Sequence, residues 1–411
     1  MSFTTFNLDP SIMAGVTALG YTIPTPIQTK SIPPIMEGCD LIGLAQTGTG
    51  KTAAFVLPVL HRLHQGHRNK VRAVVLSPTR ELAEQTSVVI NDLGREANLH
   101  SIPIYGGVSM DQQIRGLRRG NEIVVACPGR LLDHIWKGSI NLSNVEILII
   151  DEADRMFDMG FIQDIRNILK CLPSRKQTLL FSATMPDDIR RLVQEILTNP
   201  VTVQIGQSRP ATTVTHTLYP VKQNLKIALL IEVLRKIETE SVLVFTRTKY
   251  RAERVTDQLK KAGFKAASLQ GNLSQGRRQA AIDGFRGGAF KILVATDIAA
   301  RGIDVLSISH VVNFDMPENN DAYIHRIGRT GRVEKNGDAL TLVTNEDAGK
   351  VRDLERSLKM TLKRQVLEGF DYNKSVPVRT NSDTRFPQKF NRHMPRARVA
   401  VVNRNRHTTY R

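Results

Sequence analysis

The chain has 411 residues, too many for one ordinary domain, and at roughly 150 residues per domain its length predicts two or three folded units. Hydrophobic residues at 41% and charged residues at 23% are typical of globular proteins and exclude a wholly disordered chain. The formal net charge of +18 at pH 7 favours a polyanionic partner such as nucleic acid. Anionic membrane is the competing partner, but no apolar run approaches the roughly 18 residues that span a bilayer, and the first residues lack a signal-peptide pattern.

The cysteine pattern indicates a reducing compartment. Cys39, Cys127 and Cys171 are the three cysteines of the sequence, an odd number without CxxC spacing. This pattern argues against a disulfide framework and against a zinc site. We therefore expect a soluble, non-secreted protein of the cytoplasm.

The first half of the chain alternates between two kinds of segment. Short apolar runs rich in β-branched residues predict buried parallel strands. Stretches with helical periodicity lie between them, for example over residues 52–63 and 80–96. This alternation predicts a doubly wound parallel sheet with flanking helices. The predicted strands are residues 40–45, 72–77, 121–126, 145–150 and 177–182.

A polar, proline-bearing stretch then interrupts the pattern and predicts an exposed connection over residues 207–216. It divides an N-terminal domain, residues 1–206, from a second domain, residues 217–372. The alternation of strand and helix resumes beyond it, so we expect a second α/β lobe. The strands predicted there are residues 241–246, 291–295, 310–314 and 338–343.

Periodicity stops after residue 372. Residues 373–411 contain ten Lys or Arg against one acid, Asp383, so this tail carries +9, half of the formal +18. Such a composition predicts a disordered basic tail. It favours a tether to nucleic acid, and a solubilising extension without a specific role is the alternative.

The residues after the first predicted strand have the pattern of a phosphate-binding loop. The strand runs into Ala45-Gln-Thr-Gly-Thr-Gly-Lys51-Thr52, and a helical stretch follows. Gly48 and Gly50 allow backbone N–H groups to face phosphate oxygens, Lys51 supplies positive charge, and the Thr52 hydroxyl suits Mg²⁺. The usual pattern has Gly where Ala45 stands, which points to a subtype of this loop. The predicted nucleotide contacts are Ala45, Gln46, Thr47, Gly48, Thr49, Gly50, Lys51 and Thr52.

A cluster of acids follows the predicted strand 145–150. Asp151, Glu152 and Asp154 stand at its carboxyl end, the edge at which open α/β sheets bind ligands. Asp151 would hold Mg²⁺, usually through water, and Glu152 would orient and deprotonate the water that attacks a terminal phosphate. The alternative is an acidic helix N-terminus without chemistry.

In motif order, residues 1–370 resemble the DEAD-box RNA helicases. The resemblance implies two tandem RecA-like domains that bind ATP and RNA. Residues 20–28 look like the Q motif, which we place within residues 4–32, with Phe6 as its upstream aromatic residue. The family pattern implies that Gln28 reads adenine and that Tyr21 packs on the base.

The resemblance also assigns contacts with RNA and a coupling motif. In Ser182-Ala-Thr184, the hydroxyls would hydrogen-bond Asp154 and link ATP turnover to strand separation. Cys127 departs from the Thr that the family usually carries before Pro-Gly-Arg. Taken one at a time, the arginines of these motifs could instead be ordinary surface charges without a role in RNA binding. The RNA contacts implied by the resemblance are Pro78, Thr79, Arg80, Gly107, Pro128, Gly129, Arg130, Arg247, Gln275, Arg278, Thr296 and Gly302.

The last motif, His325-Arg-Ile-Gly-Arg329-Thr-Gly-Arg332, resembles the arginine-finger motif of the family. By this resemblance, Arg329 and Arg332 reach the γ-phosphate from the second lobe when the lobes close, and Asp304 lies near the nucleotide. Within the family, residues 244–248 and 367–370 before a basic tail look most like the bacterial RhlE-type branch.

These features predict an RNA-dependent ATPase that unwinds short duplexes or remodels RNA–protein complexes, with ATP and Mg²⁺ as cofactors. Single-stranded RNA and ATP would bind cooperatively and close the lobes. Ribosomal or RNA-decay proteins are candidate partners, and no membrane partner is expected. Two alternatives remain open: a DNA-directed helicase or translocase, and a non-enzymatic RNA clamp or annealing scaffold.

Overall fold

The computed structural model describes residues 2–46, 48–174, 176–205, 214–237, 240–300, 308–330 and 337–374. The chain divides into two units, Met1–Tyr372, which holds both sheets, and Asn373–Arg411. Four residues that the sequence singles out lie outside the described residues, as do segments 206–213 and 375–411, which contain most of the predicted connection and of the basic tail. The four residues are Thr47, Gly302, Asp304 and Arg332.

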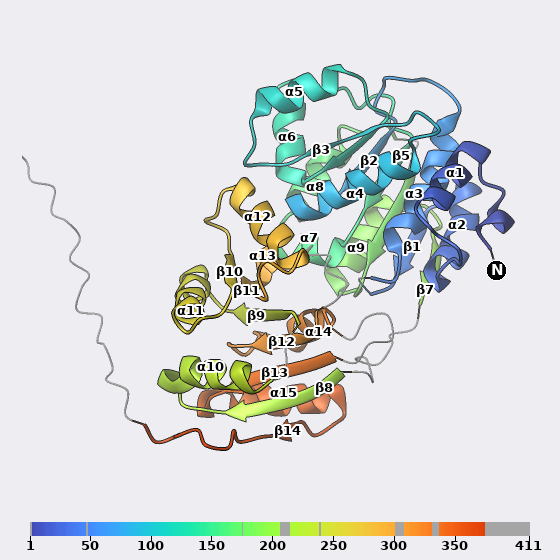
Figure 1. The fold of residues 1–411 in the computed structure, drawn as a ribbon. Coiled ribbons are helices and arrows are strands. Elements are labelled where there is room, and N and C mark those ends of the chain that lie inside the picture. The colour runs from blue at the N-terminus through green and yellow to red at the C-terminus, as the bar shows by residue number, and fades with distance from the viewer. Residues whose placement is uncertain are drawn as a thin grey trace, which may run out of the picture. The chain divides into compact units, whose positions relative to one another are not determined.

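The first lobe is built on a sheet whose described strands are all parallel (Figure 1). In space they follow the order β3-β4-β2-β5-β6-β1-β7. The five predicted strands are confirmed, and two edge strands were missed, because β3 contains Pro103 and β7 is largely exposed. The strands are β1 (Leu41–Leu44), β2 (Ala73–Leu76), β3 (Ser101–Ile104), β4 (Ile123–Ala126), β5 (Ile147–Ile150), β6 (Gln177–Ser182) and β7 (Val201–Gln204).

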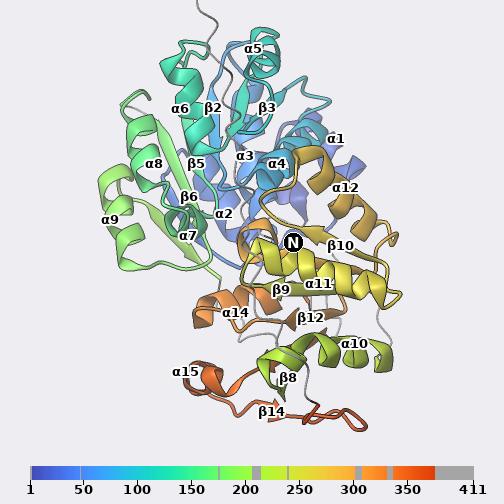
Figure 2. The same cartoon turned by 90° about the vertical axis from the view of Figure 1, so that its left-hand side faces the viewer.

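Helices cover both faces of this sheet, which explains why its central strands are apolar throughout (Figure 2). In β2, Ala73 and Val75 join one core cluster, whereas Val74 and Leu76 join the other. The helices are η1 (Phe3–Phe6), α1 (Pro10–Ala18), α2 (Pro26–Met36), α3 (Lys51–His64), α4 (Arg80–Leu93), α5 (Met110–Arg118), α6 (Pro128–Trp136), α7 (Ala153–Asp158), α8 (Ile162–Leu169) and α9 (Asp187–Ile196).

The second lobe repeats this architecture with the strand order β10-β11-β9-β12-β13-β8-β14, again parallel in the described residues. The predicted strands are confirmed, whereas β8, β10 and β14 were missed. Because β8 begins at Val214, the last three residues of the predicted connection belong to the second sheet. The strands are β8 (Val214–Pro220), β9 (Val242–Thr246), β10 (Ala266–Leu269), β11 (Ile292–Thr296), β12 (His310–Asn313), β13 (Gly337–Val343) and β14 (Lys363–Arg364).

Helices also flank the second sheet, so its central strands are buried on both faces. They are η2 (Gln223–Leu225), α10 (Lys226–Lys236), α11 (Lys249–Lys261), α12 (Gln275–Arg286), α13 (Asp297–Ala300), α14 (Asn320–Ile327), η3 (Asn345–Asp347) and α15 (Ala348–Leu358). Among the described residues, none of the helices is both long and apolar enough to cross a membrane.

The start of strand β8 was not predicted because its polar His216 is buried against a partner. His216 is 6% exposed, and its Nδ1 lies 2.9 Å from the hydroxyl of Tyr323 on α14. The two rings stack with centroids 5.9 Å apart. Burial lowers the pKa of His216 below its ordinary value of 6.5, so the folded lobe favours the neutral imidazole.

Acid should therefore weaken the fold through His216. Its pKa is depressed in the folded state, so the unfolded chain binds the proton more readily, and stability is lost as pH falls below 6.5. We expect the urea midpoint to decrease between about pH 7.5 and about pH 5.5. His216→Asn, which cannot titrate, should show a smaller decrease. An equal decrease in both proteins would contradict this assignment.

Candidate functional site

The phosphate loop lies between the carboxyl end of β1 and the start of α3. Gly48 and Gly50 have φ values of 87° and 90°, in the left-handed region that favours glycine. Lys51 is 6% exposed, and its Nζ donates to the carbonyl oxygen of Ala45 at 2.8 Å. The Thr49 hydroxyl donates to the Gln46 carbonyl at 2.7 Å. These contacts close the loop on itself and hold the lysine at its centre, and Thr52 follows in the first turn of α3.

The Q motif packs directly on this loop. Gln28 is buried in the first turn of α2, where its Oε1 accepts from the Thr25 backbone N–H at 2.8 Å. Its Nε2 donates to the carbonyl oxygen of Gly50 at 3.1 Å. A Cβ on Gly50 would lie 2.6 Å from that nitrogen, so glycine is also required by space. Gln28 thus links the Q motif with the phosphate loop.

The aromatic residues of the Q motif are joined by a residue that the sequence reading missed. Phe3 stacks on Tyr21 with ring centroids 6.2 Å apart and meets Phe6 edge-on at 5.9 Å. Phe3 and Phe6 are both buried at the ends of η1. The three-residue spacing of Phe3 and Phe6 could have predicted that both rings lie on the same side of a short helical turn.

The acidic cluster stands at the end of β5, and its first two carboxylates are both buried. Glu152 has φ 53°, a left-handed conformation that non-glycine residues rarely adopt and that concentrates at functional sites. Its Oε2 pairs with a guanidinium nitrogen of Arg155 at 2.5 Å, and both side chains are nearly inaccessible. Burial, with the neighbouring Glu152 carboxylate adding to it, raises the pKa of Asp151.

Asp154 connects the acidic cluster with the end of β6. Its Oδ2 accepts from the backbone N–H groups of Ala183 at 3.1 Å and Thr184 at 2.9 Å. The predicted hydroxyl contact is confirmed, because the Thr184 Oγ1 donates to the same oxygen at 3.1 Å. The Ser182 hydroxyl accepts from the Asp154 backbone N–H at 3.2 Å.

The electrostatic surroundings keep Asp154 ionised. Burial alone would raise its pKa, but Lys51, the Thr184 N–H and His325 of the second lobe oppose burial, and the pKa of Asp154 is lowered. The pKa of Asp154 therefore depends on charged groups of both lobes.

Two predicted arginines converge on a glycine pair in the first lobe. The guanidiniums of Arg80 and Arg130 each approach within 3.9 Å of the position that a Cβ on Gly106 would take. Gly107 has φ 87°, and a Cβ there would lie 2.2 Å from Arg80. Two cations beside exposed backbone suit a phosphate group.

The other predicted residues of this region have structural duties. The Thr79 hydroxyl caps α4 by accepting from the Leu82 N–H at 3.4 Å. Pro128 is buried in the first turn of α6, and Gly129 follows it. Pro78 is buried ahead of α4.

The ion pair between Arg278 and Glu81 joins the two lobes. Arg278 on α12 binds Glu81 on α4, with its Nε 2.8 Å and its second terminal nitrogen 2.6 Å from the Glu81 Oε1. The side chains are only 11% and 4% exposed. The sequence predicted Arg278 as an RNA contact, whereas in this structure its guanidinium holds the first lobe. Gln275 lies at the start of the same helix.

A cavity of about 950 Å³ opens between the lobes. The first lobe contributes Asp154 and Thr184 to its wall, and the second contributes Arg247, Thr296 and Arg329. The structure therefore brings five predicted residues from five motifs to one cavity.

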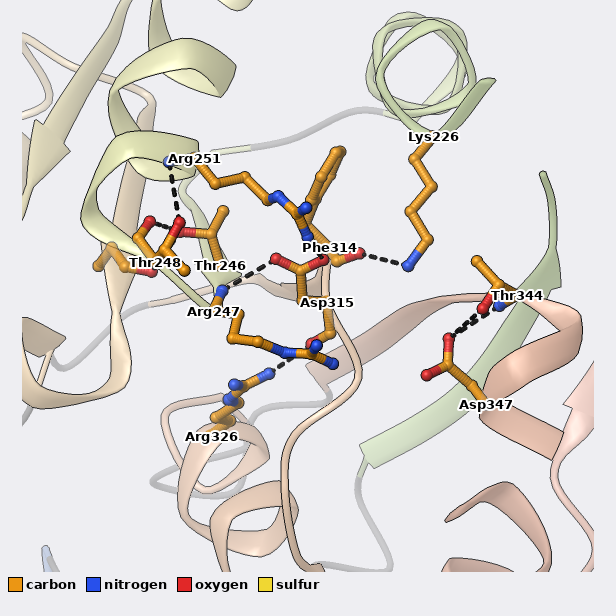
Figure 3. A network of polar contacts seen from close by, with 11 residues as sticks. Lys226, Thr246, Arg247, Thr248, Arg251, Phe314, Asp315, Arg326, Thr344 and Asp347 are labelled. Carbon is orange, nitrogen blue, oxygen red and sulfur yellow. Dashed lines mark hydrogen bonds and ion pairs between the residues drawn. The ribbon is translucent and has the colours of Figure 1, made fainter. Parts of the chain in front are cut away.

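Asp315, which follows β12, binds two arginines that line this cavity, Arg247 and Arg326, in the polar network of Figure 3. Its Oδ2 accepts from the backbone N–H of Arg247 at 2.9 Å, and its Oδ1 pairs with Arg251 at 2.5 Å. Its carbonyl oxygen accepts from Arg326 at 2.8 Å. Nearby, the buried Lys226 donates to the carbonyl oxygen of Phe314 at 3.0 Å.

Arg326 is the most heavily engaged cation of this network. It is 3% exposed and binds both carboxylate oxygens of Asp297, at 2.6 and 2.7 Å. It also donates to the side-chain oxygen of Asn313 at 3.0 Å and lies over the ring of Phe245 at 5.0 Å. The sequence motif did not distinguish this internal role from that of Arg329.

Fold and site together define a phosphate-loop protein of two tandem parallel α/β lobes. The DEAD/DEAH box helicase family model matches residues 25–192, and the helicase conserved C-terminal domain matches residues 225–334.

Relatives extend this match over most of the chain. The DEAD-box ATP-dependent RNA helicase CshA of Bacillus cereus is 41% identical over 364 residues, 88% of this chain and 69% of that protein. CshA of Listeria monocytogenes is 43% identical over 358 residues, 87% of this chain and 69% of that protein. The structure of Saccharomyces cerevisiae Dbp5 bound to RNA and ADP BeF3 is similar at a TM-score of 0.80, with 30% identity over 89% of this chain and 95% of that one.

The chain belongs to the DEAD-box helicase family, and its lobes are two tandem RecA-like domains. The predicted family and fold class are confirmed.

Replacing Arg326 by Lys should destabilise the second lobe by about 3 kcal/mol, because an ammonium cannot bind the acceptors that the planar guanidinium reaches together. Urea denaturation measures the loss. Arg356→Lys is the control, since Arg356 is 80% exposed and pairs only with Asp353 in the described structure. Equal stability of the two variants would contradict the role given to Arg326.

Proposed function

We propose that this protein is an ATP-dependent RNA helicase that hydrolyses ATP when RNA binds and locally unwinds short duplexes or remodels RNA–protein complexes. The supporting observation is the position of Asp154. Its carboxylate is bonded to Thr184 and electrostatically coupled to Lys51, and it lines a cavity whose opposite wall carries Arg329. The carboxylate that joins the acidic cluster to the Ser-Ala-Thr segment and an arginine of the second lobe therefore line one cavity.

ATP is proposed to bind across the loop 45–52. The loop N–H groups and Lys51 would hold its phosphates. The negative charge of the terminal phosphate would attract the Lys51 ammonium away from its present hydrogen bond to the Ala45 carbonyl. Gln28 would read adenine, beside the aromatic cluster that contains Tyr21 and Phe6. Its contact with Gly50 would transmit the presence of the base to the loop.

The residues present fit Mg²⁺. Mg²⁺ in nucleotide sites keeps waters and takes few protein oxygens, so the lack of a cluster of three ligand residues in the described structure agrees with such a site. Thr52 and the buried Asp151 would hold the ion, and a cation there would offset the burial and the Glu152 charge that raise the pKa of Asp151. When bound, Mg²⁺ neutralises phosphate charge.

Glu152 is proposed as the residue that orients and deprotonates the attacking water. Its left-handed backbone and its bond to Arg155 fix the carboxylate, so Arg155 is a positioning residue that the sequence reading missed. Arg329 would stabilise the charge of the γ-phosphate from the second lobe. Arg332 is proposed for the same task and Asp304 for a place near the nucleotide, and both lie outside the described residues.

RNA is proposed to cross both lobes by its sugar-phosphate backbone. Arg80, Gly107 and Arg130 would hold one part of the strand, and Arg247 and Thr296 another. Backbone contacts carry little sequence information, so binding should tolerate many sequences. The Arg278–Glu81 pair would stabilise the closed lobes, and a strand that bends to follow both would release its partner.

Finer assignments are part of this proposal. The RhlE-type branch rests on residues 244–248 and 367–370, whereas the relatives described above are named CshA. We also propose a cytoplasmic location and protein partners from ribosome assembly or RNA decay.

Glu152→Gln should lower RNA-stimulated ATP hydrolysis by at least about 100-fold, because an amide cannot accept the water's proton. ATP affinity should change little. Glu195→Gln, the same change at an exposed carboxylate of the first lobe, is the control.

The same assays separate the alternatives. RNA should stimulate hydrolysis more than DNA of the same sequence, and a greater effect of DNA would favour the DNA-directed alternative. Equal, RNA-independent turnover in wild type and Glu152→Gln would defeat the proposed mechanism and favour a non-enzymatic clamp.

Removing residues 373–411 should make RNA binding less sensitive to salt. Ten Lys or Arg leave with the segment, and each phosphate that the shortened protein no longer binds should reduce the slope of log Kd against log salt by about 0.7 for a single strand. Fluorescence anisotropy with a labelled oligonucleotide measures the slope. An unchanged slope would refute the tether.

A further inference from the structure

Gln113 on α5 is a buried residue whose amide nitrogen and oxygen both have hydrogen-bond partners. It is 6% exposed, and its Nε2 donates to the carbonyl oxygen of Tyr105 at 3.0 Å. Its Oε1 accepts from a terminal nitrogen of Arg130 at 3.2 Å and faces the Nε2 of His134 at 3.0 Å. One side chain thus joins the chain before the glycine pair to the arginine of the Pro-Gly-Arg motif.

These bonds hold both ends of the glycine loop. Gln113 binds the Tyr105 carbonyl before Gly106, and Arg130 donates to the Val108 carbonyl after Gly107 at 3.1 Å. Between these two anchors, the backbone passes so close to Arg80 that a Cβ on Gly107 would not fit. The position of the loop and the position of Arg130 therefore depend on the same amide.

The orientation of the Gln113 amide determines the tautomer of His134. The imidazole is fully buried, and its Nδ1 lies 2.8 Å from the Ser139 hydroxyl. Because the Gln113 Oε1 is an acceptor, the His134 Nε2 must donate, and the neutral ring then accepts from Ser139. Burial and the nearby Arg130 lower the pKa of His134, which agrees with a neutral ring. A flipped Gln113 amide would set its NH₂ against the Arg130 guanidinium, which can only donate, and its oxygen against the Tyr105 carbonyl, which can only accept.

We propose that Gln113 and His134 are positioning residues for RNA binding, which hold Arg130 and the Gly106–Gly107 loop in the arrangement that receives a phosphate. This inference rests on the proposed function, in which Arg80, Gly107 and Arg130 contact RNA. Neither residue needs to touch RNA. Their loss should act on RNA affinity rather than on the rate of hydrolysis once RNA is bound.

The test compares Gln113→Ala with Gln177→Ala in full-length protein. Gln177 is a matched control, because it is 5% exposed, its Nε2 donates to the carbonyl oxygens of Ile35 and Cys39, and its Oε1 accepts from Arg62. Three quantities are measured: the oligo(U) RNA concentration for half-maximal ATPase stimulation, kcat at saturating RNA, and the melting temperature.

We expect Gln113→Ala to raise the half-saturating RNA concentration about tenfold, the effect of losing one hydrogen bond to a charged group, with kcat changed by less than about twofold. Gln177→Ala should lower the melting temperature without this shift. Equal shifts in both variants would overturn the inference and reduce Gln113 to a packing role.

His134 supplies a second pair of variants should Gln113→Ala fold poorly. His134→Gln can keep a donor near the Nε2 position and should retain RNA affinity, whereas His134→Phe fills the space without a donor and should lose it. Equal affinity in the two would overturn the inference.

Arg130→Ala distinguishes failure of the inference from failure of the proposed function. If Arg130→Ala weakens RNA stimulation and Gln113→Ala does not, the inference alone is wrong. If Arg130→Ala has no effect, the proposed RNA contact is wrong and the inference falls with it.

Discussion

The parallel order β5-β6-β1 is the constraint on which the first lobe's site depends. All strands of the sheet run in one direction, so the chain leaves β1, β5 and β6 at one edge. Those exits are the phosphate loop, the acidic cluster and the Ser-Ala-Thr segment, which lie far apart in the sequence. The hydrogen bonds from residues 183 and 184 to Asp154 are possible only because β5 and β6 are neighbours.

The charged side chains at this edge of the sheet are buried, and their burial determines which of them ionise easily. Asp151, Glu152 and Asp154 are all buried there, with the buried cations Lys51 and Arg155 to balance them. Three carboxylates against two cations leave a negative excess where desolvation is costly. The cost falls on Asp151, whose pKa is raised, whereas Asp154 is kept ionised by Lys51 and backbone donors. The site is thus arranged to gain from a further cation.

The central strands and the motif residues could be predicted from the sequence. A strand buried on both faces is a continuous apolar run, and a glycine-rich loop before Lys51 is typical of a phosphate-binding site. It did not reveal β8, whose polar His216 is buried against Tyr323, 107 residues away. It also did not reveal partners. Arg278 and Glu81 are 197 residues apart, and no local pattern announces that their side chains meet.

Arg326 and Arg329 are three residues apart in one motif, yet their side chains have different surroundings. Arg326 lies on α14 and turns inward, where Asp297 after β11 and Asn313 at the end of β12 hold its guanidinium. These bonds tie α14 to the carboxyl ends of β11 and β12, the two strands that flank β9 in the sheet. Arg329 stands in the turn that follows α14 and lines the cavity. The internal arginine therefore holds the last turn of α14 against the sheet, and Arg329 follows directly after that anchored turn.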